Sequence, residues 1–291
     1  MCPGKAPTSP TVTAIDAGRL HPLDAHAPHS RMRIDQLLVQ RQLASSRAQA
    51  QRLIASGVQW QQGDVWLRAS KHGQEVPDDA PLRLLDESEA RYVSRGGLKL
   101  AAALAHTGVQ VQGARCLDVG QSTGGFTDCL LQAGAAQVLG LDVGHGQLHA
   151  RLRQDPRVLC IEGVNARDAQ AVADALAPVA APASVDVLVL DVSFISQTLL
   201  WPALLPWLKP GAALLMLVKP QFELQPGQVG KGGIVRDSAL YLAVRQRLEA
   251  AAAALGLDVL RWLDSPIKGG DGNREFFIYA RAAQHGPAQH I

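Results

Sequence analysis

The stretch from Cys116 to Leu131 reads C-L-D-V-G-Q-S-T-G-G-F-T-D-C-L-L and constrains the fold of this chain more than any other. A short apolar strand leads into a turn that carries three glycines, and an amphipathic helix follows the turn. Glycines let a ligand approach the backbone, and the free amides at the start of a helix favour an electron-rich group. The stretch therefore predicts a cradle for a ligand, built from a strand, a loop and a helix.

The spacing of the loop indicates which ligand the cradle takes. A dinucleotide site requires G-x-G-x-x-G, whereas here Asp118 precedes Gly120. An acidic residue in that position suits a ligand with an ammonium group and no phosphate, such as the amino-acid end of S-adenosylmethionine. We therefore predict S-adenosylmethionine as the cofactor. The loop residues predicted to hold it are Asp118, Gly120, Ser122, Thr123, Gly124, Gly125 and Phe126.

Two further residues are predicted to contact the nucleoside of this cofactor. An apolar run ends in Asp142, and a carboxylate at a strand tip can accept both ribose hydroxyls. Alone, Asp142 is equally a surface turn acid, but the glycine loop upstream favours the ribose anchor. Asn165, after the next expected strand, is predicted to flank the adenine, although it can also cap a helix in an ordinary turn.

Length and composition limit the class of protein. The chain has 291 residues, enough for one full domain and a small one, and 47% of them are hydrophobic, which predicts a sizeable core. No apolar run approaches the roughly 20 residues that span a bilayer, and no signal peptide is expected. The four cysteines lack metal-ligand spacing and are typical of reduced thiols. We therefore expect a cytoplasmic protein without a membrane span or a metal.

The first 91 residues differ in pattern from the rest of the chain. Residues 1–30 are rich in Pro, Ala, Thr and His and predict a disordered extension. Two helices are expected next, the second capped by Ser46 and ended by Gly57, and a short β segment then runs to Leu85. Seven basic residues lie between Arg31 and Lys71 against two acidic ones. The net charge of the whole chain is only +2, but the basic residues are concentrated in this segment and predict a basic face on a small domain.

This basic segment resembles a known RNA-binding module. The run R-I-D-Q-L-L-V-Q-R-Q-L-A-S-S-R-A-Q-A-Q-R-L-I-A-S-G-V-Q-W is similar to the module named after ribosomal small-subunit protein S-four. The resemblance implies that Arg33, Arg47 and Arg52 line a surface that reads folded RNA by shape and phosphate. The charge alone would also fit a solvated two-helix cap. We predict an S-four-type RNA-binding domain over residues 31–91.

From about Tyr92 the chain alternates strands and helices, with helices expected over Gln197–Leu208 and Asp237–Leu255 among others. This alternation predicts an α/β domain over residues 92–282, followed by a flexible tail over 283–291. The expected fold is a Rossmann-like, mostly parallel sheet with helices on both faces and ligands at the carboxyl ends of the strands. Catalytic candidates are therefore polar residues at strand ends. With Lys99 on an early helix, they are Asp191, Lys219 and Glu275. Each alone could be a helix cap, a solvated lysine or an ion-paired acid.

Together, these four residues resemble the Lys-Asp-Lys-Glu tetrad of ribose 2'-O-methyltransferases of the FtsJ type, in the same chain order. With S-R-G-G-L-K-L, D-V-S-F-I-S, V-K-P-Q-F-E and the S-four-type module, the chain resembles the TlyA-type (haemolysin A-like) rRNA methyltransferases over about residues 32–281. The resemblance implies S-adenosylmethionine-dependent 2'-O-methylation of a cytidine ribose, with ribosomal RNA or ribosomal subunits as partner. Gln121 departs from the pattern, because alanine is more usual there.

The chemistry explains these residue types. The methyl of a sulfonium is already activated, so the enzyme must align it with a ribose hydroxyl and accept one proton. Lys219 is the candidate base, and we expect Lys99 and partial burial to lower its pKa. Asp191 would orient Lys219 and also bind on the cofactor side, and Glu275 would position Lys99 or the ribose. No metal is required, because no phosphate is transferred.

Three other functions are alternatives to this one. A pseudouridine synthase can carry the same RNA-binding module but needs no nucleoside cradle. A pore-forming haemolysin would need a spanning segment or a strong amphipathic pattern, which the sequence lacks. The remaining alternative is a non-enzymatic RNA- or ribosome-binding protein with a retained methyltransferase fold, and the intact tetrad disfavours it.

Overall fold

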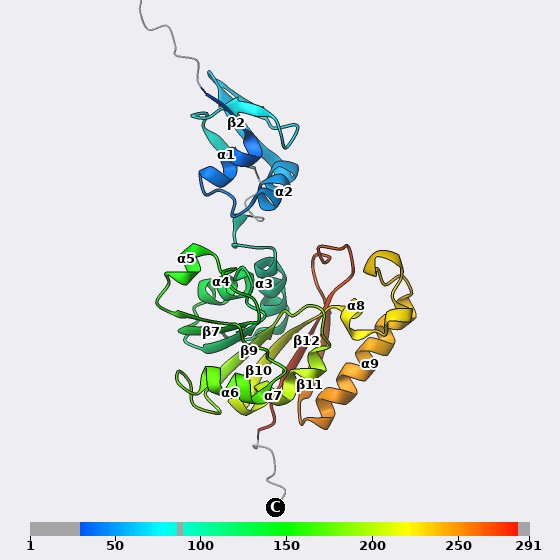
Figure 1. Ribbon diagram of the computed structural model, residues 1–291. Helices are drawn as coiled ribbons and strands as arrows, with labels where there is room; N and C mark the ends of the chain where they lie inside the picture. The colour runs from blue at the N-terminus through cyan, green and yellow to red at the C-terminus, as the bar shows by residue number, and fades with distance from the viewer. Residues whose placement is uncertain (1–29, 86–89, 285–291) are drawn as a thin grey trace, which may run out of the picture.

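The computed structural model describes residues 30–85 and 90–284, which form a small N-terminal part and a larger α/β part (Figure 1). The predicted extension up to residue 29 and the predicted tail from residue 285 lie outside the described residues, as do residues 86–89 of the connector. Each part has its own buried core.

The N-terminal part packs two helices on short antiparallel strands. Its elements are β1 (Arg31–Arg33), α1 (Ile34–Gln40), α2 (Arg47–Gly57), β2 (Val58–Gln62), β3 (Val65–Arg68), β4 (Glu75–Pro77) and β5 (Leu82–Leu84). The Ser46 side chain caps α2 by accepting a hydrogen bond from Gln49 N, and Gly57 ends this helix, as expected. The β segment expected up to Leu85 is split, because β4 pairs with β1 whereas β5 pairs with β2. Prolines at 77 and 81 lack the amide hydrogen that one continuous strand would need.

The larger part is the predicted α/β fold, and this prediction is confirmed. Seven strands form one sheet in the order β11-β12-β10-β9-β6-β7-β8. They are β6 (Arg115–Val119), β7 (Gln137–Asp142), β8 (Val158–Glu162), β9 (Val185–Leu190), β10 (Leu208–Val218), β11 (Asp258–Asp264) and β12 (Phe276–Arg281). The strands from β10 to β8 are parallel, and β12 is antiparallel to both its neighbours.

Helices cover both faces of this sheet. They are α3 (Gly96–Thr107), α4 (Gly125–Gln132), α5 (Ala150–Arg153), α6 (Ala169–Leu176), α7 (Trp201–Leu204), α8 (Pro220–Glu223) and α9 (Ser238–Ala254). Helices α3, α4 and α5 lie on one face of the sheet, and α6, α7 and α9 lie on the other (Figure 1). Their buried side chains form a separate core on each face. Successive strand residues alternate between the two cores, as the pleat of a sheet covered on both sides requires.

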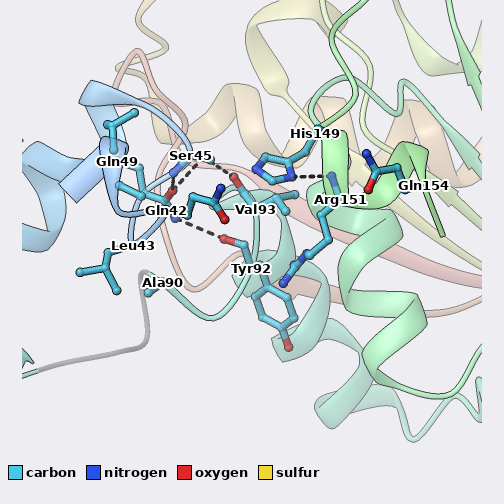
Figure 2. Close-up of a pocket in the computed structure, with 13 residues that line it drawn as sticks. Gln42, Leu43, Ser45, Gln49, Ala90, Tyr92, Val93, His149, Arg151 and Gln154 are labelled. Atoms are coloured by element: carbon cyan, nitrogen blue, oxygen red, sulfur yellow. Dashed lines mark hydrogen bonds between the residues drawn. The ribbon is translucent and has the colours of Figure 1, made fainter. Parts of the chain in front are cut away.

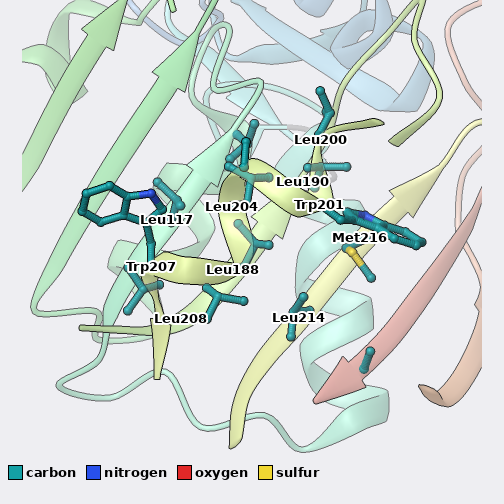
Figure 3. Close-up of a cluster of buried hydrophobic side chains, with 14 of the residues drawn as sticks. Leu117, Leu188, Leu190, Leu200, Trp201, Leu204, Trp207, Leu208, Leu214 and Met216 are labelled. Carbon is teal, nitrogen blue, oxygen red and sulfur yellow. The ribbon is translucent and has the colours of Figure 1, made fainter. Parts of the chain in front are cut away.

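One predicted helix is wrong in its form. The helix expected over Gln197–Leu208 is a series of short turns, of which α7 is the only α-helical one, because Pro202 and Pro206 interrupt the hydrogen-bond ladder. The segment is nonetheless held firmly, since Trp201 is fully buried against Leu190 and Met216 of the sheet (Figure 3). It therefore keeps the loop that precedes it, after β9, in a fixed position.

The register of the sheet determines which residues meet at its carboxyl edge. Val119 at the end of β6 pairs with Leu190 at the end of β9, so the glycine loop lies beside Asp191. On the other side of β9, strand β10 leads to Lys219, which immediately follows Val218. Val218 in turn pairs with Phe276, where the antiparallel β12 begins. The residue before that strand is Glu275, which therefore arrives at the same edge.

Candidate active site

The glycine loop between β6 and α4 closes tightly against the loop after β9. Gly120 has a φ of +81°, and a Cβ added to it would lie 2.3 Å from the Asp191 carbonyl oxygen. The Gly120 amide also donates to Leu141 O at 2.8 Å, which ties the loop to the end of β7. Only a residue without a side chain fits between these backbones.

A cavity of about 490 Å³ opens between the ends of β6, β7 and β9. Asp142 and Asn165 both line it, together with Gly120 and Ser122 of the loop. The Asp142 carboxylate accepts hydrogen bonds from Ser122 N at 2.6 Å and from Gly144 N at 2.7 Å, one on each oxygen. Each oxygen keeps a second lone pair for a ligand. The cavity is thus large enough for a nucleoside and carries one oriented carboxylate.

Asp118 lies beneath this cavity and does not line it. Its carboxyl group is completely buried and accepts a hydrogen bond from Thr127 Oγ1 at 2.7 Å, and Thr127 accepts one from Gln121 Nε2 at 2.8 Å. The second oxygen of Asp118 has no partner among the described residues. The Gln121 side chain is buried against Gly140, where an added Cβ would lie 2.1 Å from it. Gln121 therefore points into the protein rather than toward a ligand.

Burial raises the pKa of Asp118 to about 7 despite the hydrogen bond from Thr127, whereas an aspartate in an unfolded chain ionises near pH 4. Between these values only the unfolded state ionises, so the free energy of unfolding falls as pH rises from about 4 to 7, by up to about 4 kcal/mol. We expect Asp118→Asn to raise the melting temperature above that of the parent at pH 8 but not at pH 4.

Thermal unfolding across this pH range tests the expectation. The exposed carboxylate of Asp64 offers a matched control, and Asp64→Asn should shift the melting temperature little at any pH. A difference between Asp118→Asn and the parent that stayed constant from pH 4 to pH 8 would contradict the assignment.

The four tetrad candidates meet as two ion pairs. Lys99 Nζ lies 2.5 Å from Glu275 Oε2, with both side chains buried. Lys219 Nζ lies 2.6 Å from Asp191 Oδ1 and donates a hydrogen bond to Ser193 Oγ at 2.8 Å. Burial raises the pKa of Glu275, and the Lys99 ammonium opposes this effect. Each lysine thus has its own carboxylate, with Asp191 beside Lys219 and Glu275 beside Lys99 as expected.

These pairs lie at a second cavity, of about 290 Å³. Lys99, Lys219 and Asp191 line it, and so do Thr123 and Phe126 of the cofactor loop. The two cavities share Gly120, Ser122, Asp191 and Ser193. The nucleoside-sized cavity is therefore contiguous with a cavity that presents two lysines.

Two features of this region were not singled out in the sequence. The buried Glu223 carboxylate accepts hydrogen bonds from Ser196 Oγ at 2.6 Å, Gln197 N at 3.0 Å and Arg247 Nη2 at 2.6 Å, so it joins the loop after β9 to α8 and α9. Phe194 in the same loop has a φ of +65° and is 89% exposed, with its ring 4.9 Å from that of Phe222. An aromatic ring so exposed at a cavity rim suits stacking against a nucleobase.

The three predicted RNA-binding arginines fall into two groups. Arg33 and Arg47 both pair with the buried carboxylate of Asp35, at 2.9 and 3.3 Å, while about half of each side chain stays exposed. The hydrogen bond from Arg33 lowers the pKa of Asp35. Arg52 instead lines the cavity that holds the tetrad. The N-terminal part thus reaches the candidate active site itself.

The segment before α3 connects the two parts. Ser45 Oγ donates to Val93 O at 2.9 Å, and Gln49 Nε2 donates to Tyr92 O at 3.2 Å (Figure 2). Val93 N donates in turn to Asp128 Oδ2 on α4, the helix that follows the glycine loop, at 2.9 Å. A cavity of about 600 Å³ lies beside these bonds, and Arg151 lines it (Figure 2). The N-terminal part is therefore linked through Tyr92 and Val93 to the helix that begins at the cofactor loop.

Within residues 30–85 and 90–284, no helix is long and apolar enough to cross a membrane, and no group of His, Cys, Asp and Glu could hold a metal ion. The sheet and its glycine loop are those of an α/β enzyme, with a nucleoside-sized cavity next to a cavity lined by two lysines. The FtsJ-like methyltransferase family model matches residues 92–282, and the chain belongs to this family.

Relatives with both parts of the chain support a narrower placement. The chain is 44% identical over 255 residues to the 16S/23S rRNA (cytidine-2'-O)-methyltransferase TlyA of Mycobacterium tuberculosis, covering 86% of this chain and 90% of that protein. It is 37% identical to Hemolysin A of Brachyspira hyodysenteriae, covering 85% and 99%. A solved structure of a Streptococcus thermophilus protein described as a hemolysin is 38% identical, with a TM-score of 0.63 and coverage of 88% and 90%. The predicted resemblance to TlyA-type proteins is confirmed.

Proposed function

We propose that this protein transfers a methyl group from S-adenosylmethionine to the ribose 2'-hydroxyl of a cytidine in ribosomal RNA. The observation that carries the proposal is the meeting of two lysine–carboxylate pairs, Lys99–Glu275 and Lys219–Asp191, beside a nucleoside-sized cavity. The activity for which the relative from Mycobacterium tuberculosis is named agrees with it. In this proposal residues 31–91 bind RNA and residues 92–282 carry out the transfer.

The residues of the larger cavity fit the cofactor. Asp142 holds two backbone amides and keeps lone pairs for ribose hydroxyls, Asn165 offers an amide beside the adenine, and Gly120 leaves room for close approach. Asp118 is fully buried below the same loop and lines neither cavity, so its role is to support the loop through Thr127. When bound, S-adenosylmethionine supplies an activated methyl group. The chain's own task is then to position a hydroxyl and to remove its proton.

Lys219 and Lys99 divide this task between them. Lys219 Nζ, in its neutral form, accepts the proton of the 2'-hydroxyl, and Asp191 and Ser193 hold the amine in place before and after the transfer. Lys99, fixed by Glu275, donates a hydrogen bond to the ribose and limits its rotation. Phe194 offers its exposed face to the base of the target nucleotide. Since ribosomal RNA is the substrate, the protein acts in the cytoplasm.

The direct test is to incubate the protein with methyl-labelled S-adenosylmethionine and separated ribosomal subunits, and then to map the label. Label at the 2'-oxygen of a cytidine is the expected result. Binding to a subunit without any transfer of label would instead support the non-enzymatic alternative.

Cofactor binding is expected to depend on Gly120. A Cβ at this position would meet the Asp191 carbonyl at 2.3 Å and would adopt an unfavourable φ. We therefore expect Gly120→Ala to weaken S-adenosylmethionine binding by about 100-fold or more in calorimetry, equivalent to about 2.7 kcal/mol. Gly108 is a matched control, because its φ is +67° but nothing lies within 4 Å of an added Cβ. If Gly120→Ala bound the cofactor as tightly as Gly108→Ala, the loop would not be the cradle.

A further inference from the structure

The cavity that holds the tetrad carries more positive charge than the proposed methyl transfer uses. Lys99 and Lys219 are each matched by a carboxylate, Glu275 and Asp191. Two arginines line the same cavity in addition, Arg95 at the start of α3 and Arg52 on α2 of the N-terminal part. The tetrad is neutral as a set, so Arg95 adds a positive charge that no member of the tetrad balances.

Of the two arginines, Arg95 is the one whose side chain has no structural role in the rest of the described chain. Its side chain is half-buried, and its guanidinium has no hydrogen-bond or carboxylate partner among the described residues. Arg95 and Lys99 are one helical turn apart, so they project on the same side of α3. A Cβ added to Gly270 would lie 3.5 Å from Arg95 Nη2, and one added to Gly269 would lie 2.6 Å from Glu275 Oε1. The guanidinium therefore sits near the Lys99–Glu275 pair.

We infer that Arg95, with Arg52, binds a phosphodiester of the RNA substrate inside the catalytic cavity, namely the phosphate on the 3' side of the target ribose. This inference rests on the proposed function. In RNA the reacting 2'-hydroxyl and the 3'-phosphate are on neighbouring carbons of one ribose, so a hydroxyl at Lys219 brings that phosphate within the same small cavity. A guanidinium can hold two phosphate oxygens at once, which fixes orientation as well as charge.

Because it includes Arg52, this phosphate site depends on the N-terminal part of the protein. It belongs to the N-terminal part, whereas the other residues of the cavity belong to the methyltransferase part. The phosphate site is therefore completed only when α2 is docked through Ser45 and Gln49 on the segment before α3. The RNA-binding part does more than hold the ribosome, because one of its arginines helps to place the nucleotide that reacts.

The test measures kcat and KM for separated ribosomal subunits over a range of salt concentrations, using Arg95→Gln, Arg95→Lys, Arg52→Gln and the double variant Arg95→Gln/Arg52→Gln. Arg95→Gln is expected to lower kcat/KM about 10- to 100-fold, the effect of one lost charge-assisted hydrogen-bond pair. The salt dependence of log KM should become shallower by about 0.7 to 1, the effect of one lost phosphate contact. The kcat/KM of Arg95→Lys should lie between those of the parent and Arg95→Gln, since lysine keeps the charge but cannot hold two phosphate oxygens at once.

Controls separate this site from a general loss of charge or of structure. Arg261→Gln removes an exposed arginine from the edge strand β11 and should leave kcat/KM within about twofold of the parent. S-adenosylmethionine affinity and melting temperature should be unchanged in Arg95→Gln, whose side chain has no partner to lose. If both arginines hold the same phosphate, the double variant should lose less than the product of the two single losses.

The outcomes distinguish this inference from the proposed function. If the parent protein methylates ribosomal RNA but Arg95→Gln behaves like Arg261→Gln, the phosphate site is wrong and the proposed function stands. Strictly multiplicative losses in the double variant would overturn the shared site. A parent protein that transfers no label to either subunit would instead overturn the proposed function itself.

Discussion

Replacing Lys219 by arginine is expected to lower kcat by about 10²- to 10⁴-fold, the range that general base catalysis contributes. Arginine keeps the positive charge and can still pair with Asp191, which lies 2.6 Å from Lys219 Nζ. It cannot deprotonate at working pH and so cannot accept the proton of the hydroxyl. Binding of S-adenosylmethionine and of ribosomal subunits should remain close to that of the parent.

The sheet offers a matched control for this substitution at its opposite edge. Lys209 near the start of β10 pairs with Asp186 of β9 at 2.5 Å, so it repeats the lysine–aspartate pairing of the same two strands away from the cavities that hold the tetrad and the cofactor loop. Lys209→Arg should leave kcat unchanged. If Lys219→Arg kept near-normal turnover, Lys219 would act only as an electrostatic anchor, and alignment of hydroxyl and methyl would have to account for the rate.

The elements that a local pattern determines were predicted from the sequence. The glycine loop, the strand that ends in Asp142 and the helix that Asp237 caps all occur where expected, because apolar periodicity and capping residues act over a few residues. The expected strand topology also predicted that the members of the tetrad meet at one edge of the sheet. The helix over Gln197–Leu208 was wrong because two prolines outweighed its apolar period.

The sequence predicted that Asp191 orients Lys219 and that Glu275 positions Lys99 or the ribose, and both ion pairs occur. It could not predict their distances, because these depend on the register between β10 and β12. In the sequence, Glu223 is one residue of V-K-P-Q-F-E with no distinguishing feature. Only the tertiary structure shows that it joins the loop after β9, α8 and α9. Arg95 looked like part of S-R-G-G-L-K-L, and its missing partner is visible only when the whole cavity is assembled. Long-range contacts of this kind leave no periodic signal in the sequence.

Deleting residues 1–89 is expected to abolish methylation of ribosomal subunits, by at least about 100-fold, while S-adenosylmethionine still binds. The deletion removes Arg33 and Arg47 and also Arg52, which lines the catalytic cavity. Loss of several phosphate contacts lowers RNA affinity steeply. The cofactor cavity itself is lined only by residues after position 118, so calorimetry should find its affinity little changed. Normal methylation by the shortened protein would mean that the N-terminal part is not the RNA reader.

The residue at which the deletion ends matters, because the segment before α3 packs on the methyltransferase part. An added Cβ on Gly97 would lie 2.3 Å from the Tyr92 ring, and Val93 N donates to Asp128 on the helix that follows the cofactor loop. A deletion of residues 1–95 would remove both contacts and expose the buried surface of α3 and α4. We expect this longer deletion to weaken cofactor binding and lower the melting temperature as well. Equal cofactor affinity in the two shortened proteins would show that this segment supports only the RNA-binding part.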